Sequence, residues 1–161
     1  SPQNPLKKKE SLLTDFHRLS LVRIAVEDNN KLKACNEEFG LPIPSYTINT
    51  LTHLKEKFND CSFSLIMGED NLRSFHKWKN HENILQDHDI FVYPRILTEQ
   101  EIEENTNVKQ KINHENIKRC KAPIMKISSS FIREAIKNNK DVRYLLTTKV
   151  HKYLDEMNFY R

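Results

Sequence analysis

The stretch Phe63 to Met67 constrains the fold of this chain most, because it is an apolar run of strand length that stops at a glycine. A strand that is apolar on both faces is typical of a parallel sheet covered by helices. The chain has only 2 glycines, so Gly68 at this point indicates a close approach of another group to the backbone. A second apolar run, Ile90 to Tyr93, ends at Pro94. Strands that alternate with helical segments predict an α/β fold with a parallel sheet flanked by helices.

Caps and apolar spacing predict the remaining elements. Thr14 can cap a helix that runs to about Glu27, with its core-facing stripe formed by Phe16, Leu19, Val22 and Val26. Ser45 is the predicted cap of a second helix. Short strands are expected around Leu32 to Cys35 and at Lys126–Ile127. Further helices are expected near residues 70–76, 80–86, 130–138 and 148–157.

Composition narrows the function classes. The 161 residues suit one domain, and 37% hydrophobic with 30% charged residues is polar but globular. A net charge of +4 is too small to demand a polyanionic partner, and no apolar run reaches membrane length. The 3 cysteines are widely spaced, which predicts free thiols in a reducing compartment. No histidine or cysteine spacing is typical of a metal site, so no protein-ligated metal is expected.

Three consecutive serines, Ser128 to Ser130, precede a predicted helix, and Arg133 lies one turn into it. A serine N-cap explains this pattern without any ligand. The same amides, helped by the helix dipole, can instead bind a phosphate. Ser130 and Arg133 are three residues apart and share a helix face, so a guanidinium can fork onto phosphate oxygens that the serines contact. The segment therefore has two interpretations, a cap and an anion site.

A second group of residues fits a ligand that contains an aromatic ring. Trp78 is the single tryptophan and lies between Lys77 and Lys79 in a polar stretch. It suits a stacking platform as well as a core position. Tyr46 and Thr47 lie in the first turn of the second predicted helix, where backbone amides are unpaired.

These motifs, in this order, resemble the bacterial nicotinate-nucleotide adenylyltransferases of the nucleotidyltransferase superfamily. The resemblance extends over nearly the whole chain. Its segments are Ser1 to Lys7, Pro44 to Thr47, Gly68 to Asp70, Trp78, Val92 to Arg95, Ile127 to Arg133 and Val142 to Leu145. It implies a Rossmann-like nucleotidyltransferase fold with a C-terminal helical part, in a single domain over residues 1–161.

The resemblance also implies a reaction, in which the adenylyl group of ATP is transferred to nicotinate mononucleotide to give deamido-NAD and pyrophosphate in NAD biosynthesis. The catalytic residues that it implies are Arg133 and Ser130, and Asp70 is expected at the ribose hydroxyls of ATP. The implied ATP-binding residues are Gly68, Asp70, Arg95, Ile127, Ser128, Ser129, Ser130 and Arg133. The implied nicotinate-mononucleotide-binding residues are Lys7, Tyr46, Thr47, Trp78 and Lys79. Mg²⁺ is expected to be held by ATP phosphates and water rather than by side chains.

One departure from the family pattern leaves alternatives open. Members of the family begin with a strand and a loop of the type Gly-x-Phe-x-Pro-x-His-x-Gly-His, whose histidines meet the ATP phosphates, and this sequence shows no such segment. We therefore expect a domain that is incomplete at its N-terminus, with the 161 residues alone unstable and inactive. A related adenylyltransferase that uses nicotinamide mononucleotide and an inactive fragment are the alternatives. Phosphopantetheine is disfavoured as acceptor because it has no ring to stack on Trp78. A cytoplasmic location without nucleic-acid or membrane partners is expected, and self-association is left open.

Overall fold

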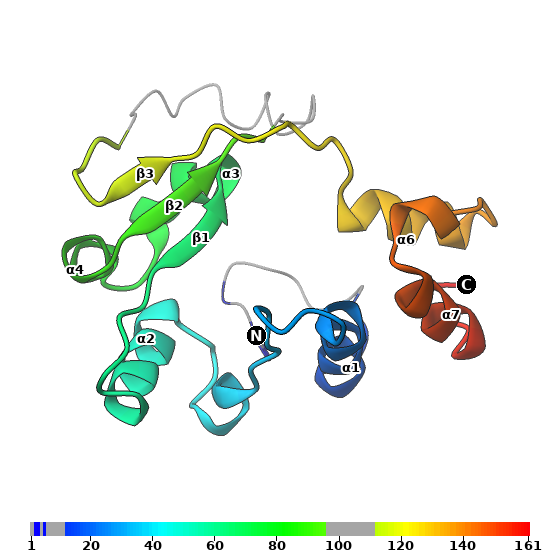
Figure 1. Ribbon diagram of the computed structural model, residues 1–161, viewed down its shortest axis with the longest axis horizontal. Coiled ribbons are helices and arrows are strands. Elements are labelled where there is room, and N and C mark those ends of the chain that lie inside the picture. The colour runs from blue at the N-terminus through cyan, green and yellow to red at the C-terminus, as the bar shows by residue number, and fades with distance from the viewer. Residues whose placement is uncertain (1, 4, 6–11, 96–111) are drawn as a thin grey trace. The chain divides into compact units, whose positions relative to one another are not determined.

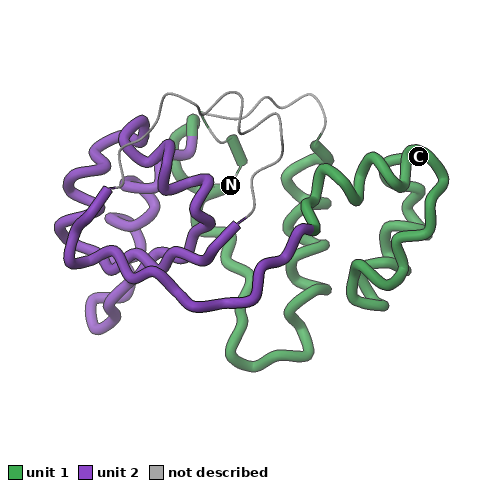
Figure 2. Tube along the Cα trace, turned by 90° about the horizontal axis from the view of Figure 1, so that it is seen from above, with its two compact units in different colours: residues 1–44, 127–161 green, residues 45–126 purple. Residues whose placement is uncertain are grey.

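The computed structural model describes residues 2, 3, 5, 12–95 and 112–161 of the chain (Figure 1). The predicted site residue Lys7 lies outside these residues. The chain divides into two compact units (Figure 2). Unit 1 comprises residues 1–44 and 127–161, and unit 2 comprises residues 45–126. The strands of the described residues all belong to unit 2.

Unit 2 is built on a parallel sheet with the strand order β1-β2-β3 (Figure 1). The strands are β1 (Leu65–Gly68), β2 (Ile90–Tyr93) and β3 (Ile117–Arg119). The α/β class and the strand Ile90–Tyr93 are confirmed. Strand β3 has no clear sequence signal because it is 3 residues long and only its first residue is buried.

Among the described residues of unit 2, three α-helices and a 3₁₀ turn accompany this sheet, namely α2 (Thr47–Lys57), α3 (Glu69–Arg73), η2 (Phe75–Lys77) and α4 (His81–Asp87). Their apolar side chains and one face of the sheet form the core, which consists of Leu51, Met67, Leu72, Phe75, Ile84, Ile90, Val92 and Ile117. On the other face of the sheet Ile66 is 78% exposed. The prediction that β1 is covered on both faces is therefore wrong for the described residues, because apolar sequence alone does not say whether a helix packs on each side.

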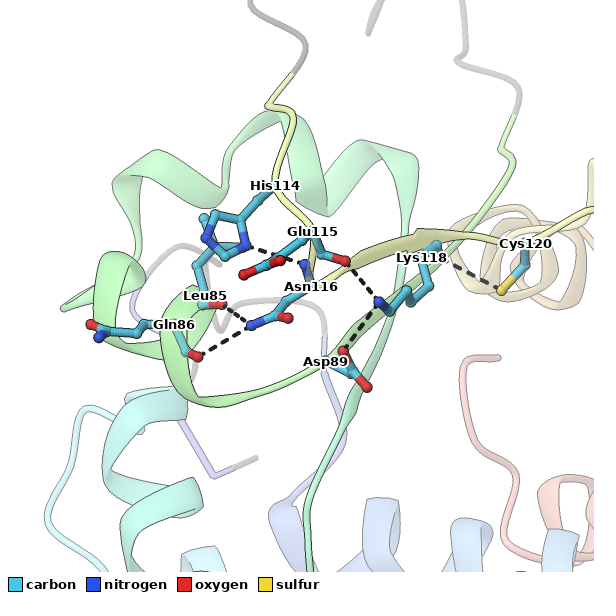
Figure 3. A network of polar contacts seen from close by, with 8 residues as sticks. All are labelled: Leu85, Gln86, Asp89, His114, Glu115, Asn116, Lys118 and Cys120. Atoms are coloured by element: carbon cyan, nitrogen blue, oxygen red, sulfur yellow. Dashed lines mark hydrogen bonds and ion pairs between the residues drawn. The ribbon is translucent and has the colours of Figure 1, made fainter.

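Polar side chains tie the loops of unit 2 together at the amino ends of the strands (Figure 3). Asn116, directly before β3, donates from Nδ2 to the Leu85 carbonyl at 2.9 Å and the Gln86 carbonyl at 3.1 Å. These carbonyls belong to the last turn of α4, where no intrahelical donor remains. Lys118 contacts the Asp89 carboxylate at 3.7 Å, so β3 is also linked to the residue before β2.

Unit 1 contains α1 (Asp15–Val26), η1 (Glu37–Gly40), α6 (Ser129–Lys137), η3 (Arg143–Leu145) and α7 (Thr148–Glu156). The α-helices in the described part of unit 1 all begin at a hydroxyl cap. The Oγ atoms of Thr14, Ser128 and Thr147 accept hydrogen bonds from backbone amides three residues later, at 3.5, 3.2 and 3.4 Å. The predicted helices from Thr14, near 130–138 and near 148–157 are confirmed to within two residues.

Helix α1 packs on α7 through a face that its sequence did not predict. His17 Nδ1 lies 3.4 Å from the Tyr153 hydroxyl, and its ring meets the Phe159 ring at 4.8 Å between centroids. Phe16 and Val22, which we predicted to face the core, are 66% and 49% exposed. The predicted core-facing stripe of α1 was wrong because Tyr153 on α7 and Phe159 after α7 pack on the side of α1 that carries His17.

Charged residues also join the C-terminal end of α1 to the start of α7. Lys149 Nζ lies 2.7 Å from a Glu27 carboxylate oxygen and 2.8 Å from Asp28 Oδ1. The hydrogen bond to Asp28, followed by the one to Glu27, raises the pKa of Lys149 above its model-compound value of 10.5.

Three local predictions are corrected by the structure. The segments 32–35 and 126–127 have no strand pairing, because a short apolar run becomes a strand only where a partner strand lies beside it. The N-cap of α2 is Tyr46, without a side-chain cap bond, rather than Ser45.

No helix in the described part of the chain is long and apolar enough to cross a membrane.

Candidate functional site

The carboxyl ends of β1 and β2 bring Gly68, Asp70, Tyr93 and Arg95 together. Gly68 is opposite Tyr93 in the parallel register, Asp70 lies in the first turn of α3, and Arg95 follows β2 by two residues. Arg95 Nη1 donates to Asp70 Oδ2 at 2.5 Å. This edge of an open α/β sheet is where ligands usually bind. Three predicted ATP-binding residues, Gly68, Asp70 and Arg95, are therefore neighbours.

Gly68 leaves room for the Asp70 carboxylate. A Cβ atom at position 68 would collide with Asp70 Oδ1 and lie 3.4 Å from the Tyr93 ring. The group that approaches the backbone at Gly68, as predicted from the glycine, is thus the Asp70 side chain. Asp70 Oδ1 is buried and has no hydrogen-bond partner among the described residues.

A longer ion pair lies at the same edge. Arg119, the last residue of β3, places Nε 4.0 Å from Glu69 Oε2 at the start of α3. Sequence reasoning missed Glu69, Tyr93 and Arg119 as neighbours of the site. The available signal was their position, because each ends or directly follows a strand whose carboxyl end lies at this edge.

The residues predicted to bind nicotinate mononucleotide also lie in unit 2, except Lys7. Tyr46 is the N-cap of α2 and Thr47 its first residue. Lys79 Nζ lies 4.6 Å from the centroid of the Tyr46 ring, so two of the predicted residues are in contact. Trp78 is half-buried, packs against the core and meets Phe75 at 5.3 Å between ring centroids. Trp78 thus packs against the core, which is one of its two interpretations, and the stacking role stays a prediction.

The serine–arginine segment lies in unit 1 at the start of α6. Ser128 Oγ caps the helix, and Ser130 Oγ accepts from Arg133 Nη2 at 3.1 Å, which confirms that the two side chains share a helix face. The Arg133 guanidinium carbon also lies 6.0 Å from the centroid of the Tyr160 ring, a neighbour that sequence reasoning missed. Ile127, Ser129 and Ser130 are exposed. The side chains are therefore gathered on a solvent-exposed helix start, compatible with both a cap and an anion site.

The rest of the described chain adds no group of ligands to this set. No three His, Cys, Asp or Glu side chains among the described residues are placed to hold a metal ion together. A cavity in unit 1 lies between the end of α6 and α7, where Lys140, His151 and Asp155 contribute to its wall. None of the predicted site residues lines this cavity.

The sequence has relatives that match it over nearly its whole length. The family model for cytidylyltransferase-like proteins matches residues 1–135. A protein of Flavobacterium psychrophilum is 57% identical over 161 residues, which are 100% of this chain and 80% of that protein. Proteins of Cytophaga hutchinsonii and Bacteroides fragilis are 41% and 39% identical, over 99% and 94% of this chain and 79% and 72% of their own lengths. All three carry the name "Probable nicotinate-nucleotide adenylyltransferase". The chain therefore belongs to the cytidylyltransferase-like family and, within it, to the nicotinate-nucleotide adenylyltransferases.

Proposed function

We propose that this protein transfers the adenylyl group of ATP to nicotinate mononucleotide, giving deamido-NAD and pyrophosphate as a step of NAD biosynthesis. The observation that carries the proposal is the sequence identity between the whole chain and proteins named "Probable nicotinate-nucleotide adenylyltransferase". For the protein of Flavobacterium psychrophilum this identity is 57%. The contact between Ser130 and Arg133 supports it, because a hydroxyl and a guanidinium that lie together can both donate to phosphate oxygens.

On the ATP side, the proposed ligands are Gly68, Asp70, Arg95, Ile127, Ser128, Ser129, Ser130 and Arg133. The acceptor phosphate is already an anion, so the reaction needs no general base. The task of the protein is to align two phosphates and to offset the charge that develops during in-line displacement. Arg133 and Ser130 have the catalytic role in this proposal, because a guanidinium and a hydroxyl at a helix start can donate to phosphate oxygens.

Mg²⁺ is proposed to arrive with ATP. This ion usually keeps several waters and binds through substrate phosphates with few protein ligands. The hydroxyl and guanidinium groups of α6 fit such a metal–phosphate group, since they are hydrogen-bond donors suited to phosphate oxygens rather than to a metal ion. Bound Mg²⁺ supplies positive charge that offsets the charge on the phosphates.

On the acceptor side, Lys7, Tyr46, Thr47, Trp78 and Lys79 are proposed to bind nicotinate mononucleotide. The support is the contact between Lys79 and the Tyr46 ring at the N-terminal end of α2, an 11-residue helix. Backbone amides of a first helical turn and an ammonium group both favour a carboxylate. A cytoplasmic reaction with small-molecule substrates is part of the proposal, supported by three exposed free cysteines at positions 35, 61 and 120.

The test is a reconstituted reaction. The protein, purified at its full natural length rather than as the 161 residues alone, is incubated with ATP, Mg²⁺ and nicotinate mononucleotide, and pyrophosphate release is followed while mass spectrometry identifies the dinucleotide. We expect deamido-NAD and pyrophosphate in equal amounts. Pyrophosphate without a dinucleotide product, or turnover only with another acceptor, would contradict the proposal.

A further inference from the structure

The cavity in unit 1 is large enough for a small organic molecule. It has a volume of about 260 Å³ and lies between the end of α6 and α7, the helices near the C-terminal end of the chain (Figure 1). Val142 and Leu154, which belong to its apolar wall, are buried, and Ile136 and Phe159 add half-buried apolar surface. An apolar cavity of about 150 Å³ can hold benzene. This cavity can therefore accept a ring that carries a small substituent.

The polar part of the wall carries more positive than negative groups. Lys140 and Arg161 supply positive charge, and Asp155 is the single carboxylate among the described residues that line the cavity. That carboxylate is already paired, because Arg161 Nη2 donates to Asp155 Oδ1. Within the described part of the chain, the Lys140 ammonium and the His151 ring make no hydrogen bond or ion pair. These available donors favour a ligand with acceptor oxygens, namely an oxyanion.

The cavity is accessible from solvent, and the helix end beside it is closed. Lys140 and Arg161 line the cavity and are exposed. A helix C-terminus normally disfavours an anion because its last carbonyls are unpaired. At the end of α6, the amide of Lys140 donates to the Ala135 carbonyl at 2.8 Å. The amide of Asn139 donates to the Ile136 carbonyl at 2.9 Å, so both oxygens are paired within the chain.

The wall of the cavity continues into a residue beside Arg133. Phe159 lines the cavity, and the ring of the next residue, Tyr160, has its centroid 6.0 Å from the Arg133 guanidinium carbon. Tyr160 has a φ of 64°, a left-handed conformation that residues with a side chain rarely adopt, so its position depends on the packing around it. A ligand that packs on Phe159 therefore acts one residue away from the contact between Tyr160 and Arg133.

We propose that the cavity is a binding site for a small organic anion, with the oxyanion group on Lys140 and His151 and the apolar part on Phe159. Occupancy of the site changes the surroundings of Arg133 through Tyr160. Binding is independent of the proposed function, because it uses none of the residues assigned to ATP or nicotinate mononucleotide. The consequence for catalysis rests on the role proposed for Arg133. Carboxylates and phosphates share the chemistry that this wall selects.

The test measures binding by NMR with the protein at its full natural length. Methyl signals of Ile136, Val142 and Leu154 report on the cavity, and the indole signal of Trp78 reports on the proposed acceptor site. The ligands are benzoate, phenyl phosphate, neutral benzamide and inorganic phosphate. We expect benzoate or phenyl phosphate to shift the cavity methyls with a Kd of about 1 mM or lower, and the tighter of the two identifies the acidic group. Benzamide, which lacks the charge, and inorganic phosphate, which lacks the ring, should bind at least about tenfold more weakly.

Charge variants test whether the wall recognises the anion. Lys140→Met should weaken binding of the tighter anion about fivefold, the upper range for an exposed charge contact, and Lys140→Arg should retain it. Asp155→Asn should instead strengthen binding about two- to fivefold, because it removes the carboxylate and releases Arg161. Lys137→Met is the matched control, since it removes an exposed lysine of α6 that does not line the cavity, and it should leave the Kd unchanged.

Three results would overturn the site. They are cavity methyls that do not move with either anion up to about 10 mM, benzamide that binds as tightly as benzoate, and an unchanged Kd in Lys140→Met. Shifts at Trp78 alone would place the anion in the acceptor site and count equally against the proposal.

The link to Arg133 is tested with the same samples. The tighter anion should shift the Arg133 side-chain signal of the wild-type protein, and Tyr160→Leu should abolish this shift while the cavity methyls still move. A missing shift at Arg133, or one that survives in Tyr160→Leu, contradicts the link. None of these measurements needs turnover. A protein that binds the anion but forms no dinucleotide therefore contradicts the proposed function and supports the site.

Discussion

At the scale of single residues, the site depends on short polar contacts that local sequence arranges. Ser130 and Arg133 meet because three residues of α-helix bring their side chains to one face, and the contact is 3.1 Å long. Gly68 is needed because Asp70 folds back over it. Arg133 is half-exposed, so its replacement should mainly change the activity. Gly68 is buried, so its replacement should mainly change the stability.

Replacing Arg133 should affect turnover far more than folding. For Arg133→Ala we expect kcat to fall by about two to three decades, because a charged contact in the transition state is worth ~2–4 kcal/mol. Steady-state pyrophosphate release measures the effect, and circular dichroism checks the fold. Arg23→Ala, which removes an exposed arginine from α1, is the control and should leave kcat unchanged. Equal kcat in Arg133→Ala and wild type would remove Arg133 from the catalytic assignment.

Adding one methyl group at position 68 should destabilise unit 2. Gly68→Ala forces the Asp70 carboxylate away from its position, and overpacking of this kind costs about 1–3 kcal/mol. Chemical denaturation measures the loss. Gly40→Ala is the matched control, since a Cβ there meets nothing within 4 Å, and its stability should stay at or slightly above that of wild type. The clash explanation also requires that Gly68→Ala costs much less when Asp70 is already alanine; an undiminished cost would show another cause.

At the scale of elements, each unit is held by a few side chains that join segments distant in sequence. In unit 2, Asn116 links the start of β3 to the last turn of α4 (Figure 3). In unit 1, Lys149 links α7 to the end of α1. An amide does not titrate, whereas an ammonium group loses its charge at high pH. The contributions of Asn116 and Lys149 to stability can therefore be distinguished by their dependence on pH.

Asn116→Ala should loosen the attachment of β3. The substitution removes two hydrogen bonds to helix-end carbonyls, and we expect a loss of about 1–2 kcal/mol in the free energy of unfolding. Asn116→Asp should be at least as destabilising, because it turns a donor into an acceptor that faces two carbonyl oxygens. Gln86→Ala is the control, since only its backbone carbonyl takes part. A stable Asn116→Asp variant would mean that these hydrogen bonds contribute nothing.

The Lys149 link should stabilise unit 1 only while the lysine is protonated. Its pKa is raised by Asp28 and Glu27, so the folded protein holds this proton more tightly than the unfolded chain does. The stabilisation is therefore fully present below pH 10.5 and is lost as pH rises through the higher, folded-state pKa. Lys149→Met should lower the melting temperature slightly at neutral pH and not at all above the folded-state pKa. Lys152→Met, which removes a pair within α7, is the comparison; a difference that persists at high pH would rule out the charge mechanism.

At the scale of the whole molecule, the proposal assigns substrate-binding residues to each unit separately. The serine–arginine segment belongs to unit 1, and the residues proposed for the acceptor ring belong to unit 2. The overall charge of +4 is modest, so recognition of two anionic substrates has to come from local groups rather than from a long-range field.

Acceptor choice is the clearest test of the residues proposed to bind nicotinate mononucleotide. We expect kcat/KM for nicotinate mononucleotide to exceed that for the nicotinamide form by about ten- to a hundredfold, because an amide leaves carboxylate-directed donors unpaired. Lys79→Met should reduce this ratio by a factor of about two to five, the worth of an exposed charge contact. Lys77→Met, on the other side of Trp78, should leave the ratio unchanged. Equal efficiency of the two acceptors with the wild-type protein would contradict the assignment of Tyr46, Thr47 and Lys79.

The sequence by itself determined the features that depend on near neighbours. The Thr14 cap, a serine cap before Arg133, the strand Ile90–Tyr93 and the shared helix face of Ser130 and Arg133 could all be predicted, because each involves residues at most a few positions apart. The α/β class followed from the alternation of such local patterns.

Only the tertiary structure decided which distant groups meet. Strand β3, the exposed face of β1 and the face of α1 that meets α7 could not be predicted, because pairing and burial depend on partners tens of residues away. The contacts of Asp70 with Arg95 and of Tyr46 with Lys79 join residues 25 and more positions apart. Sequence motifs marked these side chains one by one, but a parallel sheet brings the ends of its strands together only after the intervening helices have packed.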